Sequence, residues 1–185
     1  IVILILAILI RLNSKGHAIF RQRRVGMNGV EFNMFKLRTM YENCDDTYHR
    51  EAIKKYMQGD ALNGDARAPY KLNGDTRITK VGQLLRQMSL DEFPQFLNVL
   101  RGEMSLVGPR PPLPYEVEMY SPHDMLRLSG KPGLTGPWQV YGRSQIPFQE
   151  MVEMDIAYLQ QQSLWEDLKL IALTIPVIVL RRGGA

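Results

Sequence analysis

Two adjacent carboxylates, Asp91 and Glu92, are the residues whose type and position most favour chemistry. They follow Ser89 in the pattern of a capping box, in which the serine hydroxyl and the glutamate cap the first turn of a helix. Backbone N–H groups and the helix dipole in such a turn stabilise carboxylates and bind phosphates. Acids in a first turn are also ordinary, so the pair alone indicates only the start of a helix. Pro94 disfavours α geometry just beyond the pair and favours a distorted turn at Asp91.

Three arginines could bring an anion to this pair. Arg86 lies five residues before Asp91, and Arg110 and Arg143 lie in segments rich in proline and glycine. A guanidinium group binds a diphosphate bidentately, although each arginine taken singly is typical of a surface cation. Cations gathered around two carboxylates indicate a site for a phosphate-bearing substrate.

Two further charges fall where the pattern predicts burial. Lys36 interrupts the apolar strand pattern of residues 32–38, and Asp155 falls on the apolar stripe of a predicted helix, four residues after Met151. A buried charge is costly unless it is paired. For Asp155, which has no partner at helical spacing, a core ion pair and a metal or substrate role are both open.

The elements that would position these groups follow from local patterns. Asn28-Gly29 between two apolar segments predicts a β-hairpin over residues 18–38. Apolar residues at helical spacing predict amphipathic helices over 81–88, 93–100 and 148–159, with another from 164 onward and a short one over 50–57. Residues 108–112 and 131–137 are predicted to be rigid loops that carry cations. We therefore expect one helix-rich α+β domain, with a small hairpin packed against amphipathic helices.

Both ends of the chain are apolar. Residues 1–10 lack a polar side chain and would reach about 15 Å as a helix, roughly half the hydrocarbon thickness of a bilayer. We favour the end of a membrane segment over a short core element, and the basic cluster over residues 11–40 would then mark the cytoplasmic side. Residues 168–180, followed by two arginines, fit an interfacial helix or a C-terminal core helix equally well.

The amino-acid composition limits the classes of protein to which the chain could belong. The single cysteine, Cys44, leaves no internal disulfide and no Cys/His set for zinc, which suits a reducing compartment. The net charge of +4 and the basic hairpin would also suit a nucleic-acid-binding module, with Phe20, Phe32 and Phe35 as stacking groups. That alternative leaves the apolar ends and the loop prolines unexplained, so we expect no nucleic-acid partner. A third alternative, a non-catalytic membrane scaffold, is disfavoured by the intact carboxylate pair.

Nearly the whole chain resembles one family. The blocks that carry the resemblance are FRQRRVG (20–26), KLRTM (36–40), DTRITKVG (75–82), SLDEFPQ (89–95), NVLRGEMSLVGPRP (98–111), KPGLTG (131–136), DIAY (155–158) and DLK (167–169). They are similar to the bacterial polyprenyl-phosphate phosphoglycosyl transferases of monotopic type, the initiating sugar transferases of exopolysaccharide, capsule and O-antigen synthesis. The block around Asp91 is long and specific.

The resemblance implies a reaction: transfer of a sugar 1-phosphate from a UDP-sugar to polyprenyl (undecaprenyl) phosphate, with release of UMP. It implies that Asp91 is the nucleophile that forms an aspartyl-phosphosugar intermediate, and that Asp91 and Glu92 hold Mg²⁺. A carboxylate suits this task because it divides one displacement into two. The residues expected to bind substrate are Lys36, Arg38, Arg86, Arg110, Arg143 and Asp155.

The resemblance also implies a location at the cytoplasmic face of the bacterial inner membrane, in contact with membrane lipids. Family members enter one leaflet through a re-entrant helix, so residues 1–12 are expected to be only its outgoing half, the remnant of a truncated segment. Residues 13–185 are then the catalytic domain, with interfacial helices of its own. The resemblance leaves a homodimer open.

Overall fold

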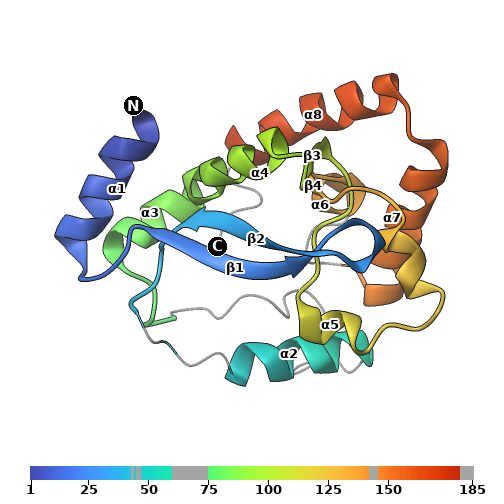
Figure 1. Ribbon diagram of the computed structural model, residues 1–185, viewed down its shortest axis with the longest axis horizontal. Helices are drawn as coiled ribbons and strands as arrows, with labels where there is room; N and C mark the ends of the chain where they lie inside the picture. Colours follow the sequence, from blue (N-terminus) through green and yellow to red (C-terminus); the bar gives the residue numbers. More distant parts are fainter. Residues whose placement is uncertain (43, 45–46, 60–74, 142–145, 180–185) are drawn as a thin grey trace.

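A β-hairpin runs through the middle of the molecule (Figure 1). The computed structural model describes residues 1–42, 44, 47–59, 75–141 and 146–179. Strands β1 (Ile19–Val25) and β2 (Glu31–Leu37) pair antiparallel, as predicted, with Phe20 opposite Lys36. A short 3-10 turn, η1 (Met27–Gly29), joins them, and Asn28 and Gly29 adopt the positive φ angles, 56° and 79°, that favour these residue types.

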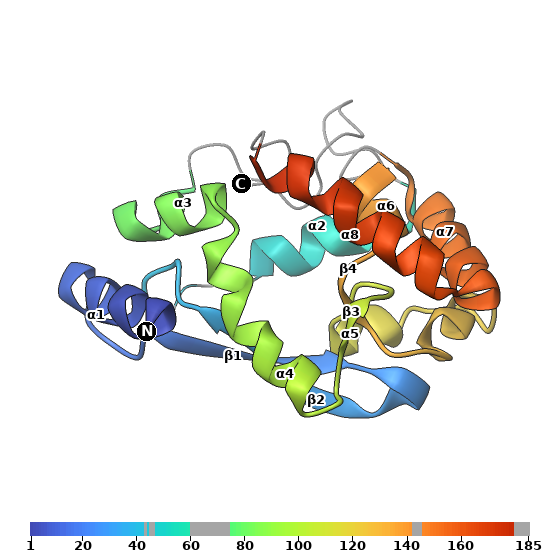
Figure 2. The same ribbon diagram turned by 90° about the horizontal axis from the view of Figure 1, so that it is seen from above.

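Three short helical elements follow one another beside the hairpin: α3 (Lys80–Gln87), the 3-10 helix η3 (Leu90–Gln95) and α4 (Phe96–Leu100) (Figure 2). The Thr79 side chain caps α3 by accepting a bond from the Gly82 N–H. Two amphipathic helices were predicted here, and the structure confirms helical segments on both sides of Ser89.

The predicted capping box at Ser89 is wrong. Ser89 adopts a left-handed conformation, with φ 53° and ψ 23°, and its side chain makes no capping bond. Pro94, inside the following turn, cannot donate to an α ladder, and the segment forms a 3-10 helix instead. The distorted turn expected at Asp91 is therefore confirmed.

A parallel pair of short strands, β3 (Ser105–Val107) and β4 (Gly133–Thr135), brings the two proline-rich segments together. Strand β4 lies within residues 131–137, which were predicted to be loop alone, so that prediction was wrong for this part. Pro132 lies just before β4, so its missing N–H removes no hydrogen bond between β3 and β4. A Cβ atom at Gly133 would lie 2.1 Å from the Gly108 backbone nitrogen, so glycine permits the close approach.

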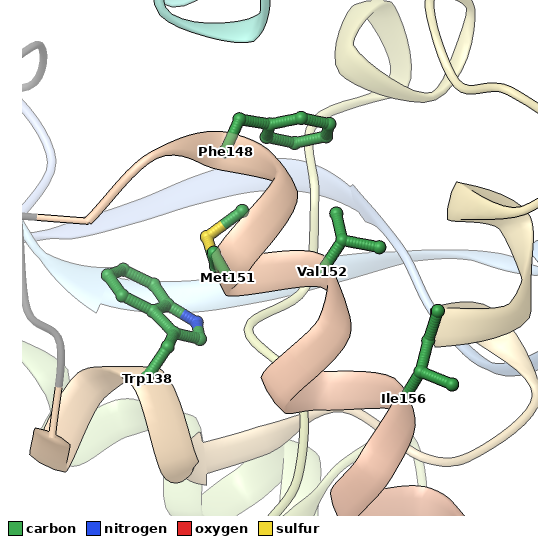
Figure 3. Packing of buried hydrophobic residues seen from close by; sticks show 5 residues of the cluster. All are labelled: Trp138, Phe148, Met151, Val152 and Ile156. Carbon is green, nitrogen blue, oxygen red and sulfur yellow. The ribbon is translucent and has the colours of Figure 1, made fainter.

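Helix α7 (Phe148–Gln161) provides one hydrophobic core, as its periodicity predicted. Its residues Phe148, Met151, Val152 and Ile156 are buried with Trp138 of α6 (Pro137–Tyr141) (Figure 3). Helix α2 (Thr47–Met57) and the short 3-10 helix η4 (Asp124–Leu128) pack against α7, whereas α5 (Pro114–Val117) lies against β1. Helices α2 and α5 lie at the opposite edge of Figure 1 from α8.

The terminal helices leave most of their apolar side chains exposed. In α1 (Val2–Asn13) Ile10 is buried against Leu37 and Leu85, whereas most of the other residues face outward. In α8 (Leu164–Val179) Leu170 is buried and Trp165 is 81% exposed, so this helix has both a core side and an exposed apolar side. Among the described residues, no helix combines the length and the apolar character needed to cross a membrane. The fold is helix-rich α+β, as expected.

Candidate active site

Residues from the hairpin, from η3, from both proline-rich segments and from α6 line one small pocket. Its members are Arg24, Met34, Lys36, Glu92, Gln95, Arg110, Pro111, Gly133, Leu134 and Gln139. At its centre the Lys36 ammonium donates to Glu92 Oε1 at 3.0 Å. The Lys36 side chain is 20% exposed and that of Glu92 43%, so the pair is open to an incoming ligand. The buried strand charge predicted at Lys36 thus has a carboxylate partner.

The electrostatics distinguish the two acids. Burial raises the pKa of Asp91 to about 6, and the neighbouring charge of Glu92 adds to this, while Lys36 and Arg86 oppose it. Burial also acts to raise the pKa of Glu92, but Lys36, Arg110 and Arg24 outweigh it and hold that pKa below its ordinary value. One carboxylate is firmly ionised, and its neighbour titrates near neutrality. Such separated pKa values are typical of functional sites.

Hydrogen bonds to Asn98 fix this part of the chain against the hairpin. The Asn98 side chain is fully buried, accepts a bond from the Phe35 N–H at 3.1 Å and donates to the Asn33 carbonyl at 2.8 Å. It also donates to Glu103 Oε2 at 2.7 Å. Since both strand contacts flank Met34 in β2, they hold α4, and with it η3, in register with Lys36.

The loop that carries Arg110 is held by the other strand. Arg24 Nη1 donates to the Pro111 carbonyl at 2.8 Å, and the Val25 N–H donates to the Pro112 carbonyl at 2.9 Å. Arg24 is buried, and Gln22 Oε1 accepts from its Nε and Nη2. Two consecutive residues of β1 therefore position two consecutive prolines.

Sequence reasoning missed several pocket residues, among them Arg24, Gln95 and Gln139. The signal for Arg24 was present: residues two apart share a face of a strand, and the register places Phe20, opposite Lys36, on the same face as Arg24. Gln95 and Gln139 carried no comparable signal, because their approach to the pocket depends on non-local packing.

The remaining predicted site residues are placed differently. Arg86 Nε donates to Thr39 Oγ1, and the positive charge of Arg86 acts on Asp91. Arg38 lies away from the pocket lining: its guanidinium donates to the Ser14 carbonyl and hydroxyl and lies 3.3 Å from Glu42 Oε1. Arg143 lies outside the described residues. The substrate contacts of Arg86, Arg38 and Arg143 stay predictions.

For Asp155 the structure supplies the core ion pair, one of the two alternatives. Asp155 Oδ2 lies 2.5 Å from Arg127 Nη2, and the two side chains are 0% and 3% exposed. Arg127 Nη1 also donates to the Tyr120 hydroxyl at 2.9 Å. Burial raises the pKa of Asp155 to about 6, and Arg127 opposes the rise. Because Arg127 lies 28 residues away, in η4, helical spacing could not reveal it. A substrate role for Asp155 stays a prediction.

The carboxylates also bear on metal binding. No group of three or more His, Cys, Asp or Glu side chains able to hold a metal occurs in the described part of the chain. Mg²⁺ commonly binds through one or two carboxylates together with substrate phosphates and water. Asp91 and Glu92 fit that arrangement, since they are two adjacent carboxylates at the start of η3.

The pocket gathers the Glu92 carboxylate with the cations Lys36, Arg24 and Arg110, and Asp91 lies next to Glu92 in the sequence. The family model described as bacterial sugar transferase matches residues 1–181. The chain therefore belongs to the bacterial sugar transferase family.

Its relatives include the galactosyl transferase CpsE of Streptococcus agalactiae, 44% identical over 170 residues, which cover 91% of this chain and 36% of CpsE. The exopolysaccharide production protein ExoY of Rhizobium meliloti is 40% identical over 185 residues, covering 98% of this chain and 78% of ExoY. A UDP-glucose:undecaprenyl-phosphate glucose-1-phosphate transferase of Caulobacter vibrioides is 39% identical over 185 residues, covering 96% and 62%. The chain thus spans about a third of CpsE and most of ExoY.

Proposed function

We propose that this chain transfers a sugar 1-phosphate from a UDP-sugar to undecaprenyl phosphate, with Asp91 as the nucleophile. The observation that carries the proposal is the arrangement of Asp91 and Glu92 at the start of η3: the charge of Lys36 acts on both carboxylates, and Glu92 lies in one pocket with Lys36 and Arg110. The name of the Caulobacter relative supports the donor and acceptor classes. The resulting lipid-linked sugar would begin the synthesis of an exopolysaccharide, capsule or O-antigen.

The reaction divides into two displacements at the same phosphorus. A carboxylate oxygen of Asp91 attacks the sugar-bearing phosphorus of the donor, and the bond from that phosphorus to the bridging oxygen breaks. UMP leaves with that oxygen, and an aspartyl-phosphosugar remains. A phosphate oxygen of undecaprenyl phosphate then attacks the phosphosugar, which frees the Asp91 carboxylate and forms the diphosphate-linked lipid. No net proton transfer is needed.

The electrostatics suit these steps. A nucleophile whose pKa is about 6 is mostly ionised at neutral pH and is also a more basic carboxylate than an ordinary aspartate. An anionic nucleophile can approach a diphosphate only when cations offset the repulsion. Lys36, Arg24 and Arg110 line the pocket beside Glu92 and provide that positive field.

The same pair would hold Mg²⁺, through the carboxylates of Asp91 and Glu92. The bound ion would offset the charge of the donor diphosphate. Lys36 now occupies Glu92 Oε1, so the metal would use the other oxygen of Glu92 or displace the ammonium.

We also place the chain at the cytoplasmic face of the inner membrane. Exposed apolar side chains are numerous along α1, along the run from α3 to α4, and along α8. The exposed residues include Leu4, Ile5, Leu12, Leu84, Phe96, Leu100, Leu164, Trp165 and Ile175. Such faces suit the interfacial layer of a bilayer, and α1 would be the outgoing half of a re-entrant helix.

The proposal is tested by measuring UMP release with a panel of UDP-sugars, undecaprenyl phosphate and Mg²⁺ in detergent or nanodiscs. We expect release that depends on both substrates and yields a lipid-linked diphosphosugar. Absence of UMP release from every donor, with the protein folded, would refute it.

A further inference from the structure

Among the described residues, one side chain holds the Arg86 guanidinium group. Arg86 Nε donates to Thr39 Oγ1 at 2.9 Å. Across the residues that the structure describes, no other protein atom forms a hydrogen bond with this guanidinium group, and both Nη groups remain free to bind a ligand. Thr39 follows the hairpin directly, whereas Arg86 lies in the last turn of α3.

Thr39 is itself fixed from several directions, so its hydroxyl has a defined place. It is buried, and its carbonyl accepts a bond from the Thr79 N–H at 2.9 Å. Helix α3 presses against its backbone, since a Cβ atom at Gly82 would lie 2.0 Å from the Thr39 carbonyl oxygen. On its other side, Arg38 is bonded to Ser14.

The bond determines which edge of the arginine is available. A guanidinium group can bind an oxyanion through its Nε–Nη edge or through its two Nη groups. With Nε engaged by Thr39, the Nη pair remains and points away from the hydroxyl. The guanidinium is planar, so this single bond also restricts its rotation.

The neighbouring charged groups leave the two Nη groups of Arg86 available to a ligand. The groups whose charges act on Arg86 are Asp91, Asp75 and Arg77. Asp75 accepts from Arg77 Nη2 at 2.8 Å and from Arg77 Nε at 2.9 Å, so its carboxylate is already engaged. The two Nη groups of Arg86 can therefore interact with Asp91 or with an anion that approaches Asp91.

We propose that Thr39 is a positioning residue that fixes Arg86 end-on toward a phosphate oxygen of the sugar-nucleotide donor. The inference rests on the proposed function, because it requires the donor phosphate to lie beside Asp91. Thr39 touches neither substrate nor the reacting atoms and acts through Arg86. It belongs to neither the pocket lining nor the residues that the sequence suggested.

The test compares Thr39→Val, which keeps the shape and removes the hydroxyl, with Thr39→Ser, which keeps the hydroxyl. We expect Thr39→Val to lower kcat/KM for the UDP-sugar about tenfold, the usual effect of losing a hydrogen bond to a charged group, and Thr39→Ser to restore most of it. The KM for undecaprenyl phosphate should change little. Thr174→Val is the matched control, because it also removes a hydrogen-bonded threonine hydroxyl but lies in α8.

A double-mutant cycle separates positioning from folding. In an Arg86→Gln background, Thr39→Val should cause no further loss, since the residue through which it acts is gone. The Nε–H resonance of Arg86, in arginine-labelled protein, should be protected from exchange in the wild type and in Thr39→Ser, and unprotected in Thr39→Val. That resonance reports on the bond whether or not the protein turns over substrate.

Three results would overturn the inference: an unprotected Nε–H in the wild type, equal kcat/KM for Thr39→Val and wild type, or equal losses from Thr39→Val with and without Arg86. A Thr39→Val variant that lowers Tm while its folded fraction keeps full kcat/KM would make Thr39 purely structural. Each of these can occur while the wild type releases UMP, so they are distinct from failure of the proposed function.

Discussion

Replacing Lys36 by methionine should move the pH dependence of catalysis in a defined direction. Among the groups that act on Asp91, Lys36 is the strongest that lowers its pKa. A cation close to an aspartate lowers the pKa of its carboxyl group by about 1–3 units. Because Lys36 acts on Asp91 through its charge and its hydrogen bond goes to Glu92, we take the lower end of that range, about one unit, as the rise in the Asp91 pKa when Lys36 is removed.

The sign follows from the need for an ionised nucleophile. With a pKa of about 6, Asp91 is half ionised at pH 6, and raising that pKa by about one unit lowers the ionised fraction to roughly a tenth. For each protein, kcat/KM at pH 6 is divided by its value at high pH. This ratio should be about fivefold lower for Lys36→Met than for the wild type. The difference should vanish near pH 9.

The assay is a profile of kcat/KM for the UDP-sugar from pH 5 to 9, by UMP release at constant Mg²⁺. Lys169→Met is the matched control, since Lys169 forms a lysine–glutamate pair with Glu166 at 3.3 Å in α8. Its acid limb should coincide with that of the wild type. Coincident acid limbs for Lys36→Met and wild type would refute the electrostatic reasoning.

Two further predictions concern the core and the metal. Arg127→Met should lower the free energy of unfolding at pH 7 by about 3–5 kcal/mol, because it leaves Asp155 buried without its cation. Urea denaturation measures this, and the double variant Arg127→Met/Asp155→Leu should recover much of the loss; a loss below about 1 kcal/mol would contradict the prediction. Chelation by EDTA should stop UMP release, with recovery on adding Mg²⁺ and little change in Tm, since the described residues form no metal cage. Full turnover in excess EDTA would contradict the metal role.

Local patterns predicted the elements whose causes are local. The hairpin followed from Asn28-Gly29, and α7 followed from apolar residues at helical spacing. The capping box failed because two local rules conflicted at the same turn, and Pro94 outweighed the serine. The pairing of β3 with β4 was missed because the two segments are far apart in the sequence.

The residues of the candidate site also fall into those that the sequence could indicate and those that depend on tertiary structure. Residue types and family resemblance selected Asp91, Glu92, Lys36 and Arg110, and the structure brings the last three together in one pocket. The elevated pKa of Asp91 could not be read from the sequence, because burial is its main cause.

The partner of Asp155 was beyond sequence reasoning for a similar reason. Arg127 reaches it from a separate short helix, and an ion pair of that kind depends on tertiary packing. Arg24, in contrast, could have been found by applying the strand register to the face that carries Lys36.

Intact-protein mass spectrometry can detect the covalent intermediate that we propose Asp91 to form. The protein is incubated with a UDP-sugar and Mg²⁺ without acceptor, quenched, and its mass compared with those of Asp91→Asn and the control Asp167→Asn. Asp167 is a suitable control because it accepts a bond from Tyr158 in α7, outside the pocket lining. We expect a sugar-phosphate adduct on the wild type and on Asp167→Asn, mapped to Asp91 in the wild type, and none on Asp91→Asn. An adduct on Asp91→Asn, or near-normal UMP release by that variant, would contradict this role of Asp91.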